Sequence, residues 1–464
     1  MPNPVKRESF LQRLSPQWLM ALGFLFAILA GAFLLTLPVA NANGLGMGPV
    51  TALFTATSAT CVTGLSVIDI GTQLTLFGQL VVLTLIQLGG LGITTFGTFL
   101  LVVVGRRLSV QSEFVLMSSY GIDEVNGLRS LLGWTMGLTF LIEGLGAFLL
   151  WTRYLLHAPE LHMPPGLWPP IYYAIFHSIS AFCNAGFSLH SDNLIPFQRD
   201  PFYLFVIDLL IVFGGLGFLV LYNLITTKFW RRNLKTRGRI TLHSKIALAA
   251  TLLLITAGAL SFLFQEWSNT LKDLPVVNKV ACALFQSITP RTAGYNAVDM
   301  GQIRETTRFT TNLLMLIGGS PGSSAGGVKT TTMVVLILTI FAICKNRRET
   351  VICSRTVPYA VVREALVIFL LAISLILTAF GILLFTEAPL KPDDASKLLF
   401  ETISASATCG LSINLTPSLS MWGRLVIITC MYVGRLGPLA VALLIGTREE
   451  SQRIRYPEEE IVVG

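Results

Sequence analysis

Charged residues are scarce in this sequence. Asp, Glu, Lys and Arg make up 12% of its 464 residues, whereas about a quarter of the residues are charged in an average soluble domain. Hydrophobic residues account for 53%. This composition excludes an ordinary soluble domain, and it predicts that a lipid bilayer surrounds most of the chain.

The sequence also lacks the histidine motif of zinc-dependent hydrolases, since its five histidines form no HExxH pattern. The seven cysteines include no CxxC pair, and Cys61, Cys183 and Cys409 lie in apolar or glycine-rich surroundings, which favours small buried side chains over disulfides or metal ligands. We therefore expect no enzymatic activity and no organic cofactor.

Long apolar runs are present instead. A helix needs about 20 apolar residues to cross a bilayer, and runs of this kind include residues 18–37, 204–224, 246–264 and 366–385. The first run is too long for the core of a signal peptide and has no clean cleavage site behind it. The predicted fold class is an all-α integral membrane protein.

The net charge of +8 comes from short basic stretches between the apolar runs. They contain Arg106 and Arg107; Lys228, Arg231, Arg232, Lys235, Arg237 and Arg239; Lys345, Arg347, Arg348 and Arg355; and Arg448, Arg453 and Arg455. Basic loops of this kind are typical of the cytoplasmic side of a membrane protein. The pattern has no aromatic interleaving, so we expect no nucleic-acid partner.

Four short segments of the sequence resemble one another. Each begins with a phenylalanine and ends with a glycine followed by a large apolar residue, and the third is one residue shorter than the others. The segments run from Phe54 to Gly64, from Phe176 to Gly186, from Phe285 to Gly294 and from Phe400 to Gly410. An internal repeat of this kind determines the fold, so it is considered before single motifs.

Each segment lies between two apolar runs, and a basic stretch follows the second run. The second runs are residues 74–104, 202–229, 309–341 and 421–445. This order predicts four M1–pore helix–M2 repeats, at residues 1–110, 111–235, 236–352 and 353–464, with eight transmembrane helices and four re-entrant pore loops. Because each repeat returns to the side it left, the repeats are parallel, unlike the inverted repeats of many carriers.

The glycine-ended segments favour an ion filter. Irregular backbone at membrane depth is tolerated where it lines an aqueous cavity, and rings of carbonyls can replace the hydration shell of K⁺. A single such glycine is more simply a helix end, but four copies in one context favour the pore. The predicted filter residues are Val62, Thr63, Gly64, Asn184, Ala185, Gly186, Thr292, Ala293, Gly294, Thr408, Cys409 and Gly410, with the four glycine carbonyls as K⁺ ligands.

With these segments the chain resembles the Trk/Ktr/HKT superfamily of potassium transporters over nearly its whole length. The resemblance includes the unusual third copy, which contains Pro290 and Arg291, and glycine at position 64, where some sodium-permeable plant members carry serine. No further helix pair precedes the first repeat, which is closer to the Ktr-type transmembrane subunit (KtrB-like) than to the longer Trk type.

The resemblance implies several properties beyond the fold. K⁺ is the expected transported ion, with Na⁺ as a second candidate. The expected partners are the lipid bilayer, a second copy of the chain in a homodimer, and a cytosolic nucleotide-binding regulatory ring (KtrA/TrkA-like). The expected location is the bacterial inner membrane, with a multi-pass chain and cytoplasmic termini.

The second run of the third repeat contains ten consecutive small or helix-breaking residues. They are Gly318, Gly319, Ser320, Pro321, Gly322, Ser323, Ser324, Ala325, Gly326 and Gly327, followed by Lys329. Glycine and proline disfavour a continuous helix, and a kink that serves packing needs fewer breakers. In the resembling family this segment is the intramembrane gating loop, so a gate is predicted here.

Arg435 lies midway along the fourth second run. A charge at this depth costs at least ~2.5–3.5 kcal/mol on insertion scales, so Arg435 should face the pore or a partner. The resemblance implies a barrier beneath the filter; a structural ion pair is the alternative. Glu143 and Asp208 also lie in apolar runs, but they belong to no repeated motif, and structural hydrogen bonding is the simpler expectation for them.

Together these features predict the pore-forming subunit of a potassium uptake system. The alternative is an alternating-access secondary cation carrier, which would use inverted repeats and broken helices around a site at the bilayer midplane. The sequence favours the pore because its repeats are parallel and one second run alone is clearly broken.

Overall fold

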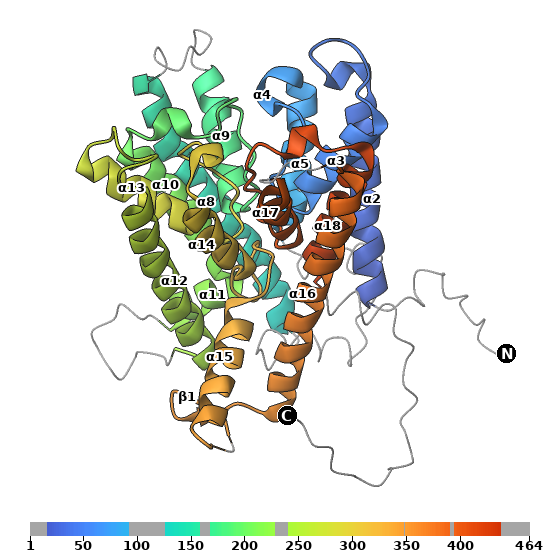
Figure 1. Cartoon of the computed structure of the whole chain (residues 1–464). Helices are drawn as coiled ribbons and strands as arrows, with labels where there is room; N and C mark the ends of the chain where they lie inside the picture. Colours follow the sequence, from blue (N-terminus) through green and yellow to red (C-terminus); the bar gives the residue numbers. More distant parts are fainter. Residues whose placement is uncertain are drawn as a thin grey trace, which may run out of the picture.

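The protein is almost entirely helical in the residues that the structure, a computed structural model, describes: 16–91, 126–157, 168–227, 240–347, 349–389 and 394–437 (Figure 1). The exception is an antiparallel hairpin of two short strands, β1 (Val351–Ile352) and β2 (Arg355–Thr356). The hairpin lies in the third basic stretch, and the sequence analysis did not predict it. Of the predicted repeat boundaries, those at residues 110 and 235 lie outside the described residues, and the one at residue 352 falls in this hairpin.

Long helices occupy the places of the eight predicted spans. They are α2 (Pro16–Thr36), α5 (Leu76–Gly90), α8 (Asn126–His157), α10 (Pro201–Leu216) with α11 (Phe218–Thr226), α12 (Leu242–Glu266), α14 (Glu305–Leu316) with α15 (Thr330–Cys344), α16 (Tyr359–Thr386) and α18 (Met421–Leu436). Within the described part, α8, α12 and α16 are each long and apolar enough to cross a bilayer, and α10 with α11 qualifies as a bent pair. The fold is therefore the predicted all-α membrane architecture.

Four shorter helices carry the repeated phenylalanines. They are α3 (Pro49–Thr60), α9 (Trp168–Phe182), α13 (Val276–Ile288) and α17 (Asp394–Ser406). Each packs against the long helix that precedes it in its own repeat. In Figure 1 they lie in the upper half of the molecule, whereas α11 and α15 lie in the lower half. The remaining elements are α4 (Ile70–Gln73), η1 (Pro38–Ala40), η2 (Ile195–Phe197), η3 (Met300–Gln302) and η4 (Thr416–Ser418).

Local sequence explains where several of these helices begin. Pro49 opens α3, at the first helical position, where a missing N–H costs nothing. Pro201 does the same for α10, and the Asp200 side chain caps this helix by accepting a hydrogen bond from the Tyr203 amide over 3.2 Å. These signals place the ends of the helices, and tertiary packing supplies most of their stability.

The second run of the second repeat is broken, and this corrects the prediction that one such run alone is clearly interrupted. Helices α10 and α11 meet at 93°. Gly217, between them, has φ +86°, a left-handed conformation that favours glycine. The nearby Gly214 serves close packing, since a Cβ there would lie 1.9 Å from the Phe182 carbonyl oxygen.

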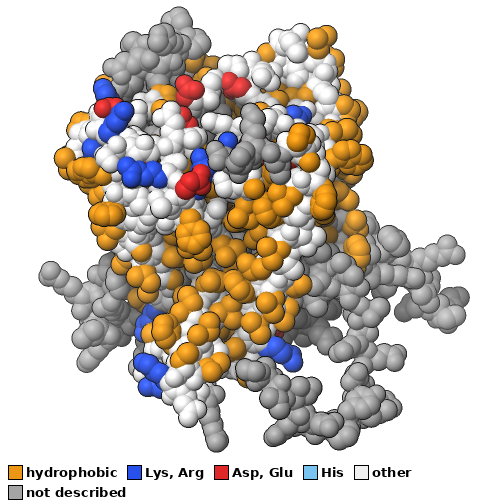
Figure 2. Space-filling model, viewed as in Figure 1, with side chains coloured by type: hydrophobic (Ala, Val, Ile, Leu, Met, Phe, Trp, Pro, Cys, Tyr) orange, Lys and Arg blue, Asp and Glu red, His pale blue; other side chains and the backbone are white. Residues whose placement is uncertain are grey.

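The surface is consistent with a bilayer around the molecule. Figure 2 shows apolar side chains over the middle of the viewed face and charged side chains toward its two ends. Large apolar residues on the long helices are exposed, among them Phe26 on α2, Phe264 on α12 and Phe385 on α16. Such a surface is unfavourable in water and suits lipid. The buried core instead surrounds the four short helices and the loops that follow them.

Candidate ion pore and gate

The loops after the four short helices share an unusual backbone. In each, a residue with positive φ is followed two positions later by a glycine with positive φ. The pairs are Val62 (55°) and Gly64 (97°), Asn184 (59°) and Gly186 (70°), Thr292 (75°) and Gly294 (76°), and Thr408 (51°) and Gly410 (92°). Positive φ is uncommon outside glycine and asparagine, so its occurrence at Val62 and the two threonines marks a backbone held in place by its surroundings. We call residues 62–64, 184–186, 292–294 and 408–410 the filter loops.

The four filter loops meet in a closed ring. A Cβ atom on Gly64 would lie 2.6 Å from the carbonyl oxygen of Ala185, the residue that precedes Gly186. The other three glycines have the same kind of neighbour. A Cβ atom would lie 2.6 Å from the Ala293 carbonyl oxygen if placed on Gly186, 2.7 Å from the Cys409 oxygen if placed on Gly294, and 2.0 Å from the Thr63 oxygen if placed on Gly410. Each glycine thus lies against the carbonyl of the next repeat, and the order returns to its start. No side chain larger than hydrogen fits at these positions.

The predicted gating segment forms a folded loop between α14 and α15. We call residues 318–327 the glycine-rich loop. Its ends are joined, since the Gly318 amide donates to the Val328 carbonyl over 2.9 Å and the Thr330 amide to the Gly319 carbonyl over 3.1 Å. Lys329, which was predicted as part of the gating segment, directly precedes α15, and its Nζ donates to the Ala325 carbonyl of the loop over 2.6 Å.

The glycine-rich loop is docked on the bend between α10 and α11. The Ser320 and Ser324 amides donate to the Gly215 and Gly214 carbonyls over 3.0 and 3.3 Å. In return, the Phe218 amide donates to the Gly322 carbonyl over 3.1 Å. The sequence analysis missed this docking surface. The glycines at 214–217 are the sequence feature that could have indicated it. The loop that bonds their freed backbone groups lies about 100 residues later in the chain.

The same loop lies against the ring of filter loops. The side chains of Asn184 and Ser324 are hydrogen-bonded over 3.0 Å, whichever way the amide is oriented. On the opposite side of the ring, a Cβ on Gly326 would lie 2.0 Å from Thr408 Oγ1. The predicted gate and the predicted filter are therefore in direct contact, through two residues that each lie two positions before a ring glycine.

Arg435 joins the glycine-rich loop to the first repeat. It was predicted midway along residues 421–445, but α18 ends at Leu436, so Arg435 lies in the last turn of that helix. Its side chain is buried, and its two terminal nitrogens donate to the Ser324 and Gly89 carbonyls. Among the described residues Arg435 has no acidic partner, so the two carbonyl acceptors hold this guanidinium in place of the alternative ion pair.

The two acidic residues noted in apolar runs, Glu143 and Asp208, differ in their hydrogen bonding. The Glu143 carboxyl on α8 accepts a hydrogen bond from Gln87 Nε2 over 3.2 Å and lies 3.8 Å from Cys183 Sγ, next to a filter loop. This confirms the expected structural hydrogen bonding for Glu143. Asp208 is buried on α10, and its Oδ1 has no partner among the described residues.

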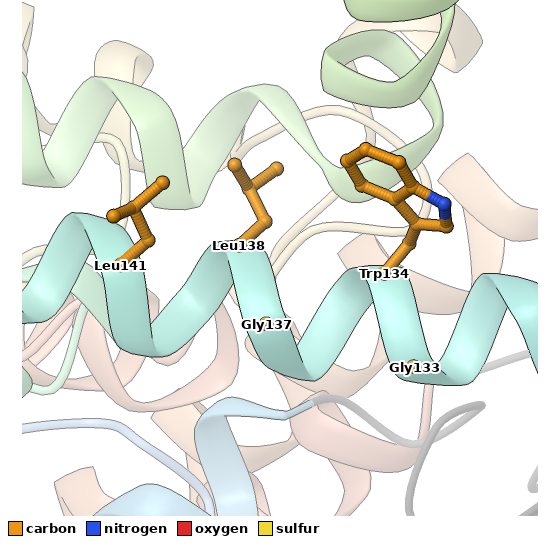
Figure 3. A pocket seen from close by; sticks show the side chains of 5 residues that line it. All are labelled: Gly133, Trp134, Gly137, Leu138 and Leu141. Carbon is orange, nitrogen blue, oxygen red and sulfur yellow. The ribbon is translucent and has the colours of Figure 1, made fainter.

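A hollow of about 360 Å³ lies along α8. In the described part of the chain it is lined by Gly133, Trp134, Gly137, Leu138 and Leu141. Figure 3 shows the three side chains on the same side of the helix, with Gly137 between Leu138 and Trp134 and with Gly133 beyond Trp134. Trp134 and Leu141 are more than half exposed. With no charged group in its lining, this hollow is a notch on an apolar surface and not an ion site.

A family model described as a cation transport protein, TrkH, matches residues 25–455 of this chain. The chain belongs to the TrkH family. Ktr system potassium uptake protein B of Bacillus subtilis is 37% identical over 455 residues, which cover 97% of each chain. Potassium/sodium uptake protein NtpJ of Enterococcus hirae is 36% identical over 465 residues, 99% of this chain and 100% of that one.

A solved structure has the same fold as this TrkH-family chain. The crystal structure of the potassium transporter TrkH from Vibrio parahaemolyticus superimposes with a TM-score of 0.71, covering 95% of this chain and 87% of that one at 17% identity. The predicted resemblance to the Trk/Ktr/HKT superfamily is thereby confirmed, together with a multi-pass membrane fold.

Proposed function

We propose that this TrkH-family chain is the pore-forming subunit of a potassium uptake system and that K⁺ crosses the membrane through the ring of filter loops. The closed ring of four glycines carries the proposal. Such a ring brings backbone carbonyls from four loops to one axis, and carbonyls so arranged can replace the hydration shell of K⁺. The similar proteins named for potassium uptake support the choice of ion.

Unpaired hydroxyls in the filter loops support the same proposal. Thr63, Thr292 and Thr408 are fully buried, and none of their hydroxyl oxygens has a hydrogen-bond partner among the described residues. A buried hydroxyl without a partner is unfavourable, and a hard cation is a suitable partner for an uncharged oxygen. Three such oxygens in the filter loops fit a path for a dehydrated monovalent cation.

The glycine-rich loop and Arg435 form the proposed gate. The loop lies against Asn184 and Thr408 of the filter loops, and Arg435 places a positive charge beside it. A cation that leaves the filter meets both the loop and this charge, so the described conformation is closed. Opening requires the loop to leave the α10–α11 bend.

The proposal also includes the location of the chain, the driving force for transport, a second ion and two partners. The chain lies in the bacterial inner membrane with cytoplasmic termini, and an inside-negative potential drives inward flux with ~2.3 kcal/mol per charge per 100 mV. Na⁺ is a second transported or coupled ion, as the name of the similar potassium/sodium uptake protein suggests. The chain forms a homodimer. It also binds a cytosolic nucleotide-binding regulatory ring, since two similar proteins are named as parts of a Ktr system.

The test is cation flux into liposomes that contain the purified chain. Uptake of K⁺ or its tracer ⁸⁶Rb⁺, with Na⁺ as competitor, is compared between the wild type and Gly64→Ser. Potassium-selective uptake that loses selectivity in the variant is the expected result. No cation flux, or selectivity indifferent to Gly64, would overturn the proposal.

One observation favours the carrier as a second candidate. In the described part of the chain, two second runs are broken, at Gly217 and in the glycine-rich loop, and broken helices are typical of alternating-access carriers. The two breaks bind each other through backbone hydrogen bonds, which favours the gate. Unitary currents in a planar bilayer indicate a pore; saturable flux accelerated by unlabelled K⁺ on the opposite side indicates a carrier.

A further inference from the structure

Each repeat contains one hydroxyl residue at or just after the end of its short helix, four positions after the phenylalanine. These residues are Ser58, Ser180, Thr289 and Ser404. All four are fully buried. We call them the brace residues, because the main chain of each is hydrogen-bonded to its own filter loop and the side chain is hydrogen-bonded to the ring glycine or to the residue after it.

The side-chain hydrogen bonds reach the backbone at or beside the ring glycine. The Gly64 amide donates to Ser58 Oγ over 3.1 Å, and the Gly410 amide donates to Ser404 Oγ over 3.0 Å. In the other two repeats the hydroxyl is the donor: Ser180 Oγ to the Phe187 carbonyl over 2.9 Å, and Thr289 Oγ1 to the Tyr295 carbonyl over 2.6 Å.

The main-chain hydrogen bonds hold the residue before the glycine. In every repeat the carbonyl of the brace residue accepts a hydrogen bond from the amide of the residue that precedes the ring glycine. The Thr63 amide donates to the Ser58 carbonyl over 2.8 Å, the Ala185 amide to Ser180 over 2.8 Å, the Ala293 amide to Thr289 over 2.9 Å, and the Cys409 amide to Ser404 over 2.7 Å. In the first and fourth repeats one residue thus fixes two consecutive peptide units of the filter loop, and in the second and third it fixes one unit before the ring glycine and the carbonyl of the residue after it.

Neighbouring hydroxyls show that this arrangement is specific. A serine or threonine within a helix commonly bonds back to the carbonyl four residues earlier. Thr57 and Thr402 do this, donating to Leu53 and Leu398 over 2.7 and 2.6 Å. Ser58 and Ser404 instead reach out of their helices to the filter loops, so helix termination alone does not account for them.

We propose that the brace residues set the width of the ring and thereby its preference for K⁺ over Na⁺, an inference that rests on the proposed function. Discrimination between the two ions depends on the spacing, number and field strength of the coordinating carbonyls. The ring glycines carry no side chains that could fix this spacing. The hydrogen bonds from the brace residues limit how far each peptide unit can rotate, and so they hold the carbonyls at the spacing that suits the larger ion.

The four positions fall into two chemical classes. In the first and fourth repeats, loss of the hydroxyl leaves a buried glycine N–H without a partner; in the second and third, it frees a carbonyl oxygen. Orphaned buried N–H groups are the rarer and less tolerated of the two. Variants at Ser58 and Ser404 are therefore expected to lose more selectivity than variants at Ser180 and Thr289.

The test measures the K⁺/Na⁺ permeability ratio of the full chain in liposomes. Ser404→Ala is compared with Thr402→Val, which removes a buried hydroxyl from the same helix, and with Ser404→Thr, which retains the hydroxyl. The ratio is expected to fall at least about tenfold in Ser404→Ala, which corresponds to about 1.4 kcal/mol. It should stay near the wild-type value in Thr402→Val and recover in Ser404→Thr.

Each outcome decides between the proposals. K⁺ flux with an unchanged ratio in a folded Ser404→Ala protein overturns the brace inference and leaves the pore intact. An equal loss of selectivity in Thr402→Val also overturns it, because general weakening of the helix would then be the cause. If Ser404→Ala does not fold, Ser58→Ala with Thr57→Val as its control repeats the test in the adjacent repeat. No cation flux in the wild type overturns the proposed function, and the brace inference with it.

Discussion

The side chains of Asn184 and Ser324 are hydrogen-bonded over 3.0 Å, although 140 residues separate them in the chain. Asn184 lies two residues before a ring glycine, and Ser324 lies in the glycine-rich loop. The Ser324 carbonyl also accepts a hydrogen bond from the Arg435 guanidinium, and the Ser324 hydroxyl donates to the Phe182 carbonyl over 3.3 Å. A single residue of the loop therefore touches the filter, the neighbouring repeat and the buried arginine.

Removing this hydroxyl should weaken the closed state. We expect Ser324→Ala to raise basal K⁺ flux about two- to tenfold, since one hydrogen bond contributes about 0.5–1.5 kcal/mol. Ser323→Ala is the matched control, because the Ser323 hydroxyl bonds within the loop, to the Ser320 carbonyl over 2.6 Å. Tracer uptake into liposomes measures both. Equal effects of the two variants would show that loop flexibility, not the link to Asn184, determines the flux.

The α10–α11 bend should act as the docking surface of the gate. A Cβ on Gly217 would lie 2.8 Å from the Pro321 carbonyl oxygen, so Gly217→Ala should displace the glycine-rich loop and raise flux. Gly437→Ala is the control. Gly437 has nearly the same φ, +90° against +86°, but no described atom lies within 4 Å of a Cβ there. Backbone strain is thus similar in the two variants, and higher flux in Gly437→Ala would contradict a specific role for the bend.

Arg435 should contribute both a charge and a link between two carbonyls. Arg435→Gln removes the charge and is expected to raise flux and to lower the melting temperature, because the Ser324 and Gly89 carbonyls lose their donor. Arg435→Lys retains the charge, but an ammonium lacks the planar fork that reaches two acceptors. Flux in the lysine variant close to that of the wild type would identify the charge as the barrier; flux close to that of the glutamine variant would identify the link.

The ring should tolerate no side chain at its glycines. A Cβ on Gly410 would lie 2.0 Å from the Thr63 carbonyl oxygen, and its φ of +92° disfavours other residues. We expect Gly410→Ala to abolish K⁺ selectivity. Gly381→Ala, on α16 with no neighbour within 4 Å of a Cβ, should leave both flux and selectivity unchanged. The measurement is uptake with and without competing Na⁺, and selective uptake by Gly410→Ala would argue against the ring as the filter.

Stability should fall in acid because of His190, in the loop that follows the second filter loop. Burial beside Tyr154, whose hydroxyl lies 3.0 Å from His190 Nε2, lowers the pKa of His190 from 6.5 to about 4. Since the folded state disfavours the charged ring, stability is complete above pH 6.5 and is lost as the pH falls toward 4. The loss is about 3 kcal/mol at most. Thermal melting between pH 7 and 4 should show a shallower acid dependence for His190→Gln.

Much of the architecture follows from features that are local in the sequence. Four copies of the phenylalanine-to-glycine segment, each between two apolar runs, predict the short helices and the ring, because each copy contains its own helix and its own left-handed glycine. The break at 318–327 is likewise predictable, since ten consecutive small or helix-breaking residues leave no helical alternative.

The bend at Gly217 depends on a distant partner. Closely spaced glycines such as those at 214–217 permit a bend but do not require one. The chain turns by 93° there against the glycine-rich loop, whose Gly322 carbonyl accepts a hydrogen bond from the Phe218 amide. The brace residues were overlooked for a related reason: a serine near the end of a helix gives no local sign that it bonds a loop six residues later.

The ring is formed by one polypeptide, and its four quarters differ in sequence. A substitution in a symmetric homotetramer appears four times at once, whereas a substitution here changes a single quarter. Asn184 contacts the gate while Val62, at the equivalent position of the first repeat, is free to serve packing alone. Selection can therefore adjust ion preference and gating in separate quarters, in small steps, without rebuilding the whole ring.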